Sequence, residues 1–235
     1  ADRVHRAATT LNRYPDRDAT VLRTALGKFI NSLSGTNFTA DSIWAANGSN
    51  EIIQSLFMAF GDRGALGFTP SYSMHPLIAK VIGVTWHDGG RRADFTLDTA
   101  KAISEITSKK PALTFITTPN NPTGTLLKID EIEELAKATA QVNGLLVVDE
   151  AYAEFSSETS AVTLIEKYPH VVVIRTMSKA FSFAGARVGY LVAHPSVIDA
   201  MFLVRLPYHL SALTQAAAEV ALDFSTELLA TVDQL

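Results

Sequence analysis

Two hydrophobic patterns alternate along this chain. Short continuous runs of apolar and β-branched residues predict buried strands, and apolar residues spaced three or four apart predict helices with one buried face. The expected strands are 43–46, 65–69, 84–86, 112–117, 144–148, 171–174 and 188–193. The expected helices are a segment ending near 11, then 21–30, 52–60, a helix that includes 77–81, 97–106, 129–142, 161–168, 195–204 and 211–224.

Strands that alternate with helices over most of a chain indicate an α/β fold. The runs 112–117 and 144–148 are almost entirely apolar, as in a sheet that is covered on both faces. We therefore expect a three-layer αβα sandwich around a mostly parallel, mixed sheet. In such sheets, ligands bind outside the carboxyl ends of the strands.

Polar residues stand at or shortly after the ends of three predicted strands. Asn121 follows the first in a cluster of turn residues, Asp149 ends the second, and Lys179 comes after the third. Each observation alone is weak, because polar residues end strands everywhere. Together they place an amide, a carboxylate and an amine on one edge of one sheet.

The segment 176–190 carries the strongest chemical signal. Lys179 stands among small and apolar residues, and Arg187 follows it by eight positions. The alternative is an ordinary surface lysine, since lysine is rarely buried without a partner. A lysine close to a phosphate-binding arginine is what a Schiff-base cofactor such as pyridoxal phosphate requires, and an apolar site would favour the neutral amine.

Residues 48–51 are a candidate for binding a phosphate. Gly48 and Ser49 precede an expected helix, whose free N–H groups and positive dipole end would attract an anion. The alternative here is an ordinary helix cap, because serine and asparagine are common in that position.

Composition excludes several classes of protein. The 235 residues carry a net charge of −4 without a basic stripe, so a nucleic acid is not an expected partner. There is no cysteine, no metal-binding histidine spacing, and no dinucleotide, Walker or nucleophile-elbow motif. No apolar run reaches the length of a membrane span. The charged loop 91–94 is expected to be solvated.

The chain resembles pyridoxal-phosphate enzymes of the aspartate-aminotransferase fold (fold type I), and among them the histidinol-phosphate aminotransferases typical of actinobacteria. The resemblance covers essentially the whole chain. It rests on R-Y-P-D-R-D (13–18), W-A-A-N-G-S-N-E-I (44–52), P-S-Y-S-M-H-P (70–76), P-N-N-P-T-G (119–124), V-V-D-E-A-Y-A-E-F (147–155), the segment 175–190 and L-V-R-L-P-Y-H-L-S (203–211).

This resemblance implies a role for each matching residue. Lys179 would bond the cofactor covalently and later move a proton, with Asp149 and Tyr152 completing the catalytic set. Asp149 would pair with the pyridine nitrogen, Asn121 and Tyr152 would hydrogen-bond the phenolic oxygen, and Tyr72 would stack on the ring. The residues expected to hold the cofactor phosphate are Ser49, Asn50, Ser178 and Arg187, and Tyr14 would reach the phosphate from the other subunit of a homodimer.

The implied activity is amino-group exchange between histidinol phosphate and 2-oxoglutarate in histidine biosynthesis, in the cytoplasm. The family's N-terminal segment and C-terminal small domain are absent, so residues 1–235 correspond to the cofactor-binding large domain. Three alternatives stay open: an aromatic aminotransferase, a decarboxylase of an amino-acid phosphate, and a catalytically silent regulatory module of the same fold. The Asn121–Pro122 peptide bond is a candidate for the cis form.

Overall fold

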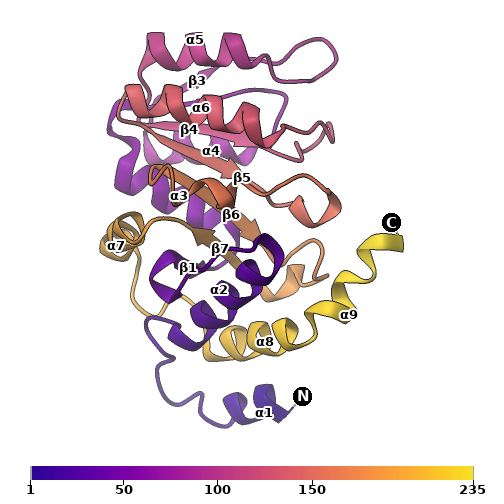
Figure 1. The fold of residues 1–235 in the computed structure, drawn as a ribbon. Coiled ribbons are helices and arrows are strands. Elements are labelled where there is room, and N and C mark those ends of the chain that lie inside the picture. Colours follow the sequence, from indigo (N-terminus) through magenta and orange to yellow (C-terminus); the bar gives the residue numbers. More distant parts are fainter. Residues whose placement is uncertain (1, 235) are drawn as a thin grey trace.

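The sheet predicted from the sequence is present. The computed structural model describes residues 2–234, in which seven strands form one sheet with the order β1-β7-β6-β5-β4-β2-β3 (Figure 1). The pairs among β2 to β6 are parallel, and β7 pairs antiparallel with β1 and with β6. The strands are β1 (Ile43–Ala46), β2 (Ala65–Gly67), β3 (Trp86–Asp88), β4 (Leu113–Thr117), β5 (Leu145–Asp149), β6 (Val171–Thr176) and β7 (Gly189–Val192).

Helices cover both faces of this sheet, which confirms the three-layer sandwich. The α-helices are α1 (Asp2–Ala8), α2 (Thr20–Ser34), α3 (Ser49–Phe60), α4 (Met74–Ile82), α5 (Thr99–Lys109), α6 (Ile129–Gln141), α7 (Pro195–Val204), α8 (Ala212–Asp223) and α9 (Ser225–Leu229). Short 3₁₀ helices are η1 (Ala40–Ser42), η2 (Gly61–Arg63), η3 (Ala153–Phe155), η4 (Ala161–Leu164), η5 (Ala184–Ala186) and η6 (Val232–Gln234).

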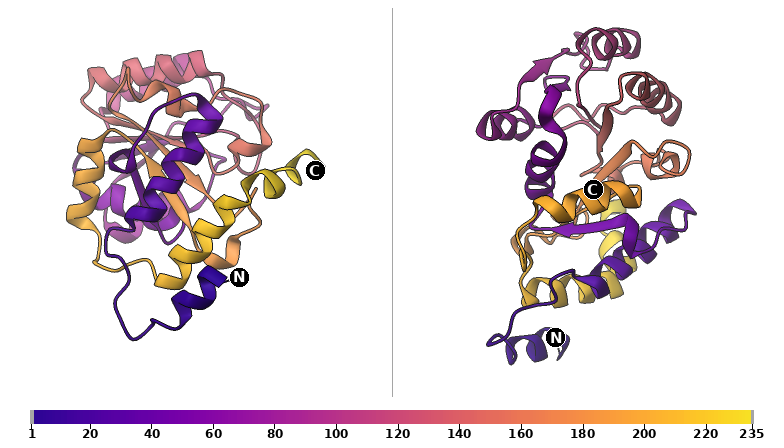
Figure 2. Two further views of the ribbon diagram at one scale, coloured as in Figure 1. Left: turned by 60° about the horizontal axis from the view of Figure 1, so that its bottom comes forward. Right: turned by 90° about the vertical axis from the view of Figure 1, so that its left-hand side faces the viewer.

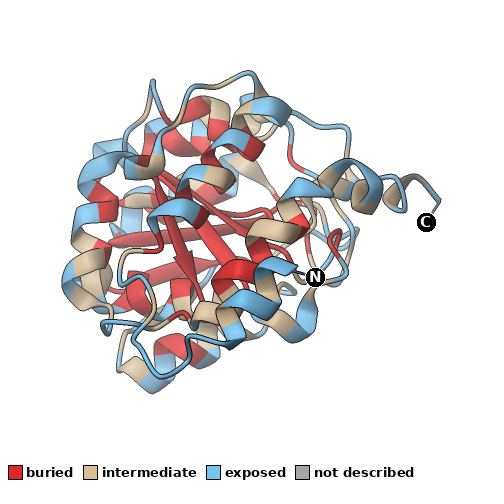
Figure 3. Ribbon diagram, turned by 90° about the horizontal axis from the view of Figure 1, so that it is seen from below, coloured by how far each residue is buried: buried red, intermediate tan, exposed pale blue. Residues whose placement is uncertain are grey.

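Alternation along the strands divides the core into two layers. Val173 belongs to the core layer that includes residues of α2, α5, α6 and α8, whereas Val172 and Ile174 belong to the layer that includes residues of α3, α4 and α7. All six residues of β6 are buried. Figure 3 shows the buried strands between helices whose outer faces are exposed. This double cover explains why the central strands read as continuous apolar runs.

The N-terminal helix packs against α8, and the segment after α8 leads away from it (Figure 1). Helix α1 lies beside α8, where Arg3 forms ion pairs with Glu219 and Asp223 (Figure 2). In the part of the chain that the structure describes, no helix combines the length and the apolarity that a bilayer crossing requires.

Two expectations about local structure were wrong. The segment 161–168 is not an α-helix: its first four residues form the 3₁₀ helix η4, and Pro169 disfavours a helical conformation of Tyr168. The loop 91–94 is not solvated throughout. Arg92 is exposed, but the Arg91 guanidinium is partly buried and hydrogen-bonded to other loops.

Register brings the carboxyl ends of the parallel strands to one edge. Thr117, the last residue of β4, lies beside Asp149, the last residue of β5, and Asp149 lies beside Ile174 in β6. The loops that follow these strands therefore leave the sheet close together. This edge is where an open α/β sheet binds its ligands.

Candidate active site

A cavity of about 160 Å³ lies at the carboxyl ends of the parallel strands. It gathers all of the predicted site residues except Tyr14. The lining residues are Ser49, Asn50, Tyr72, Thr117, Asn121, Asp149, Ala151, Tyr152, Thr176, Ser178, Lys179, Ala184 and Arg187. Thr117, Ala151, Thr176 and Ala184 were not predicted, although the first three lie in or next to predicted strand ends.

Asp149 is held rigidly at the floor of the cavity. The residue is 2% exposed, and its Oδ1 accepts a hydrogen bond of 3.1 Å from the backbone N–H of Ala151. Oδ2 lies 3.0 Å from Nε2 of His75, which is equally buried. A carboxylate in such a site would be costly without these partners. It is therefore fixed in position as an acceptor.

His75 contacts the site but was not predicted from the sequence. It lies in the first turn of α4, three positions after Tyr72, and its ring packs edge-on against the Tyr72 ring and beside Phe115. Tyr72 precedes this helix, so the separation of three positions between the two residues was the only local signal. The contact of His75 with Asp149 could not be read from it, because 74 residues separate the two in sequence.

The opposite side of the cavity forms an anion cup. Helix α3 begins at Ser49, as predicted, and the Tyr72 hydroxyl donates to the Asn50 side chain at 3.0 Å. Arg187 approaches so closely that a Cβ atom on Gly48 would lie 2.5 Å from its Nη2. The helix N-terminus and the guanidinium thus face one small space. This combination of backbone N–H groups, dipole and arginine is suited to a phosphate.

A short loop carries Lys179 to the cavity. Its ends are joined by a hydrogen bond of 3.0 Å from Met177 N–H to the Val188 carbonyl, and Arg187 has a left-handed backbone with φ of 57°. A non-glycine residue in this conformation is uncommon and often lies in a functional site. Lys179 Nζ lies 5.1 Å from the centre of the Tyr152 ring, within cation–π range.

The expectation that Lys179 is buried among apolar residues was wrong for this structure. Lys179 and Arg187 are both exposed at the mouth of the cavity, whereas Asp149 and Thr117 are buried at its floor. The apolar residues around Lys179 in the sequence, such as Ala180 and Phe181, turn into the core. They anchor the loop and leave the amine accessible.

Glu150 points away from Asp149, as expected from strand alternation. It forms a buried ion pair of 2.9 Å with Arg175, which also binds Glu154 at 3.0 Å. Glu150 also accepts hydrogen bonds from Ser160 and from the Ala161 N–H. This cluster fixes the loop that follows β5 and carries Tyr152.

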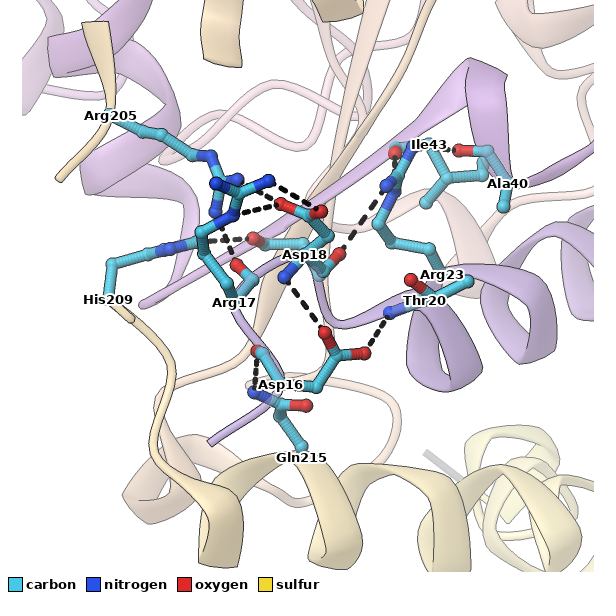
Figure 4. A network of polar contacts seen from close by, with 11 residues as sticks. Asp16, Arg17, Asp18, Thr20, Arg23, Ala40, Ile43, Arg205, His209 and Gln215 are labelled. Atoms are coloured by element: carbon cyan, nitrogen blue, oxygen red, sulfur yellow. Dashed lines mark hydrogen bonds and ion pairs between the residues drawn. The ribbon is translucent and has the colours of Figure 1, made fainter. Parts of the chain in front are cut away.

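Tyr14 does not reach the cavity of its own chain. The residue is 81% exposed, and its ring stacks on Tyr208 with 4.5 Å between the ring centres. The adjoining segment is held by a polar network: Arg205 binds Asp18 and the Arg17 carbonyl, and Gln215 binds the Asp16 carbonyl at 2.9 Å (Figure 4). Tyr14 thus stands on a rigid, outward-facing segment.

The residues present fit the cofactor that the sequence resemblance implies. The cavity is lined by a primary amine, a buried carboxylate and an aromatic ring, and by the residues of the anion cup. Gly48 and Gly189 have no side chains that would crowd the base of this cup. A Cβ atom on Gly189 would lie 2.6 Å from the backbone nitrogen of Ser49. The Asn121–Pro122 bond next to the cavity is cis, as expected.

Comparison with known proteins points to the same family as the sequence resemblance. The family model described as "Aminotransferase class I and II" matches residues 1–235. The chain is 55% identical over 235 residues to histidinol-phosphate aminotransferase of Corynebacterium glutamicum (strain R), with 99% of this chain and 63% of the relative covered. It is 53% identical over 238 residues to the enzyme of the same name from Rhodococcus jostii, with 100% of this chain and 62% of the relative covered.

A solved structure shows the same fold. Histidinol-phosphate aminotransferase from Sinorhizobium meliloti, in complex with pyridoxal-5'-phosphate, superposes with a TM-score of 0.87 at 24% identity. The superposition covers 98% of this chain and 61% of that one. The chain thus spans somewhat less than two thirds of the curated relatives it matches. With the family model matched from end to end, this chain belongs to the class I and II aminotransferases.

Proposed function

We propose that the protein containing this chain is a pyridoxal-phosphate-dependent histidinol-phosphate aminotransferase, and that residues 1–235 form its cofactor-binding domain. The observation that carries the proposal is the convergence of Lys179, Asp149 and the anion cup on one cavity, in a chain that is 55% identical to an enzyme of that name. A cytoplasmic location is part of the same proposal, because it fits a role in histidine biosynthesis.

Eight residues of the cavity have a defined task in this proposal. When bound, the cofactor supplies an aldehyde that bonds amines and a ring that stabilises negative charge on the substrate carbon. Asp149 would hold a proton on the ring nitrogen, and Tyr152 and Asn121 would hydrogen-bond the phenolic oxygen. Lys179 would be the covalent attachment point and the general base at the substrate Cα. The cofactor phosphate would be bound by Ser49, Asn50, Ser178 and Arg187.

A homodimer is part of the same proposal. Tyr14 is exposed on a segment fixed by Arg205 and Gln215, and it lies outside the cavity of its own chain. An aromatic hydroxyl presented in this way is suited to complete the phosphate site of a second copy.

The substrate assay decides between the proposed activity and its alternatives. The full-length protein, loaded with cofactor, is offered histidinol phosphate, phenylalanine or an amino-acid phosphate, each with 2-oxoglutarate. We expect kcat/KM for histidinol phosphate to be at least about tenfold higher than for phenylalanine. A substrate group that the site cannot match changes the free energy of transition-state binding by about 1.4 kcal/mol or more, which corresponds to a factor of about ten. Preference for phenylalanine would support an aromatic aminotransferase, release of CO₂ a decarboxylase, and no turnover a silent module.

Gly48→Ala is expected to weaken cofactor binding about tenfold or more, because the new Cβ would collide with the Arg187 guanidinium and because φ of 80° is unfavourable for alanine. Fluorescence titration of the apoprotein with pyridoxal phosphate measures the dissociation constant. Gly185→Ala is the matched control, since a Cβ atom there meets nothing within 4 Å. Equal affinities of the two variants would show that the phosphate does not sit beside Gly48.

A further inference from the structure

The Arg91 guanidinium joins three separate loops. Its Nε donates to the Phe68 carbonyl at 3.1 Å, and its Nη1 donates to the Phe95 carbonyl at 3.2 Å and to the Thr125 hydroxyl at 3.4 Å. Its Nη2 donates to Oδ1 of Asn120 at 3.0 Å. The acceptors come from the end of β2, from the loop before α5 and from the loop after β4.

All four acceptors are neutral. Among the residues that the structure describes, no carboxylate lies within 4.0 Å of Arg91, and burial lowers the pKa of Arg91 from its ordinary value. Guanidinium nevertheless stays charged at physiological pH. A partly buried cation without a counter-ion is held by the geometry of its hydrogen bonds, and only a planar fork of donors matches these acceptors.

Asn120 connects the hydrogen bonds of Arg91 to the loops beside the cavity. It is 3% exposed, and its Oδ1 also accepts a hydrogen bond of 2.8 Å from the Ser71 hydroxyl. Its Nδ2 donates to the Pro70 carbonyl at 3.1 Å and to the Thr123 hydroxyl at 2.7 Å. Every hydrogen-bonding site of the Asn120 amide is thus occupied, so that the amide cannot shift without losing a buried bond.

The sequence neighbours of these residues line the cofactor cavity. Asn121 follows Asn120, and Tyr72 follows Ser71. The Arg91–Asn120–Ser71 chain therefore ties the loop that carries the ring-stacking tyrosine to the loop that carries the amide expected at the phenolic oxygen.

The backbone conformation of Phe95 is a further sign that these loops are held in fixed positions. Phe95 has φ of 65° although it is not glycine, and its ring is exposed. Its carbonyl accepts from both Arg91 and the Thr125 hydroxyl. A left-handed conformation is unfavourable for a residue other than glycine and persists only where the surroundings hold it. The two hydrogen bonds to the Phe95 carbonyl are part of these surroundings.

We propose that Arg91 is a positioning residue, which through Asn120 fixes the distance between the Tyr72 loop and the Asn121 loop and so pre-shapes the cavity for the cofactor ring. The proposal rests on the proposed use of pyridoxal phosphate. It predicts that loss of the guanidinium leaves the fold intact but lets the two loops move apart, which lowers cofactor affinity.

Arg91→Gln in the full-length protein tests this inference. We expect the dissociation constant of pyridoxal phosphate to rise at least about tenfold, and backbone amide exchange in the apoprotein to speed up in residues 118–125. Arg91→Lys should behave like Arg91→Gln, because a compact ammonium group cannot reach the four separate acceptors that the planar guanidinium reaches. Visible circular dichroism of the loaded protein should weaken in both variants, since it reports how firmly the ring is held.

Arg92→Gln is the matched control, because Arg92 is the exposed neighbour that pairs with Asp98 at 3.3 Å. We expect its cofactor affinity to stay within about twofold of the wild type. Adding Arg91→Gln to Asn120→Ala should weaken binding no further than Asn120→Ala alone, if Arg91 acts through Asn120. If Arg91→Gln does not fold, Thr125→Val, which removes one acceptor, should raise the dissociation constant about two- to threefold.

Three results would overturn the inference: unchanged affinity of Arg91→Gln, full rescue by Arg91→Lys, or additive losses in the double variant. Failure of the proposed function looks different, since the wild-type protein would then not bind pyridoxal phosphate at all.

Discussion

Lys179→Ala is expected to lower the rate of amino-group transfer at least about 1,000-fold while the protein still binds pyridoxal phosphate. The substitution removes the covalent attachment point and the general base together, and general-base catalysis alone contributes about 10² to 10⁴. The anion cup and Asp149 remain, so that non-covalent binding persists. Single-turnover kinetics with histidinol phosphate measure the loss without the contribution of product release.

Lys80→Ala supplies the control for this experiment. Lys80 is an exposed residue in the last turn of α4, on a helix that also carries His75, and its loss should leave the rate within about twofold. Borohydride treatment of the wild-type protein, followed by peptide mass spectrometry, should find the cofactor on Lys179. Attachment to Lys80, Lys137 or another lysine would refute the assignment.

The second large effect is expected for Asp149→Asn. Asparagine keeps the shape and the acceptor for the Ala151 N–H, but it removes the charge that would hold a proton on the cofactor's ring nitrogen. An opposite charge at hydrogen-bonding distance shifts a pKa by about one to three units, so we expect the half-reaction to slow about 100-fold. The rate should fall further as the pH rises, since the ring nitrogen then loses its proton more readily.

Fold stability distinguishes this electrostatic role from a structural one. The asparagine side chain of the variant would still be able to bond the Ala151 N–H and the His75 ring, so the midpoint of urea unfolding should change little. Asp199→Asn, at an exposed position in α7, is the matched control for removing one acidic charge. A rate for Asp149→Asn within about threefold of the wild type would contradict the role assigned to this carboxylate.

Several features of the site were predictable because their signals are local. Asn121 and Asp149 follow apolar runs, and an apolar run that ends in a polar residue marks the end of a buried strand. Parallel strands point the same way, so their ends meet at one edge. The helix start at Ser49 was equally local, because it depends on a glycine and a short polar residue before a periodic apolar face.

One prediction failed because distant residues decided the local structure. Arg91 looks like part of a charged surface loop, yet its guanidinium donates to four acceptors in loops up to 34 residues away. The acceptors Phe68, Asn120 and Thr125 cannot be identified from the sequence around Arg91.

The sequence by itself determined the layer architecture of this protein, the family to which it belongs and the edge of the sheet where the chemistry gathers. These follow from periodicity and from motifs, which are properties of short segments. Only the tertiary structure decided that His75 supports Asp149, that Arg187 lies against Gly48 and that Tyr14 faces outward. Such pairings depend on how elements pack across the sheet, and packing is set by side-chain shape and hydrogen-bond geometry between residues far apart in the chain.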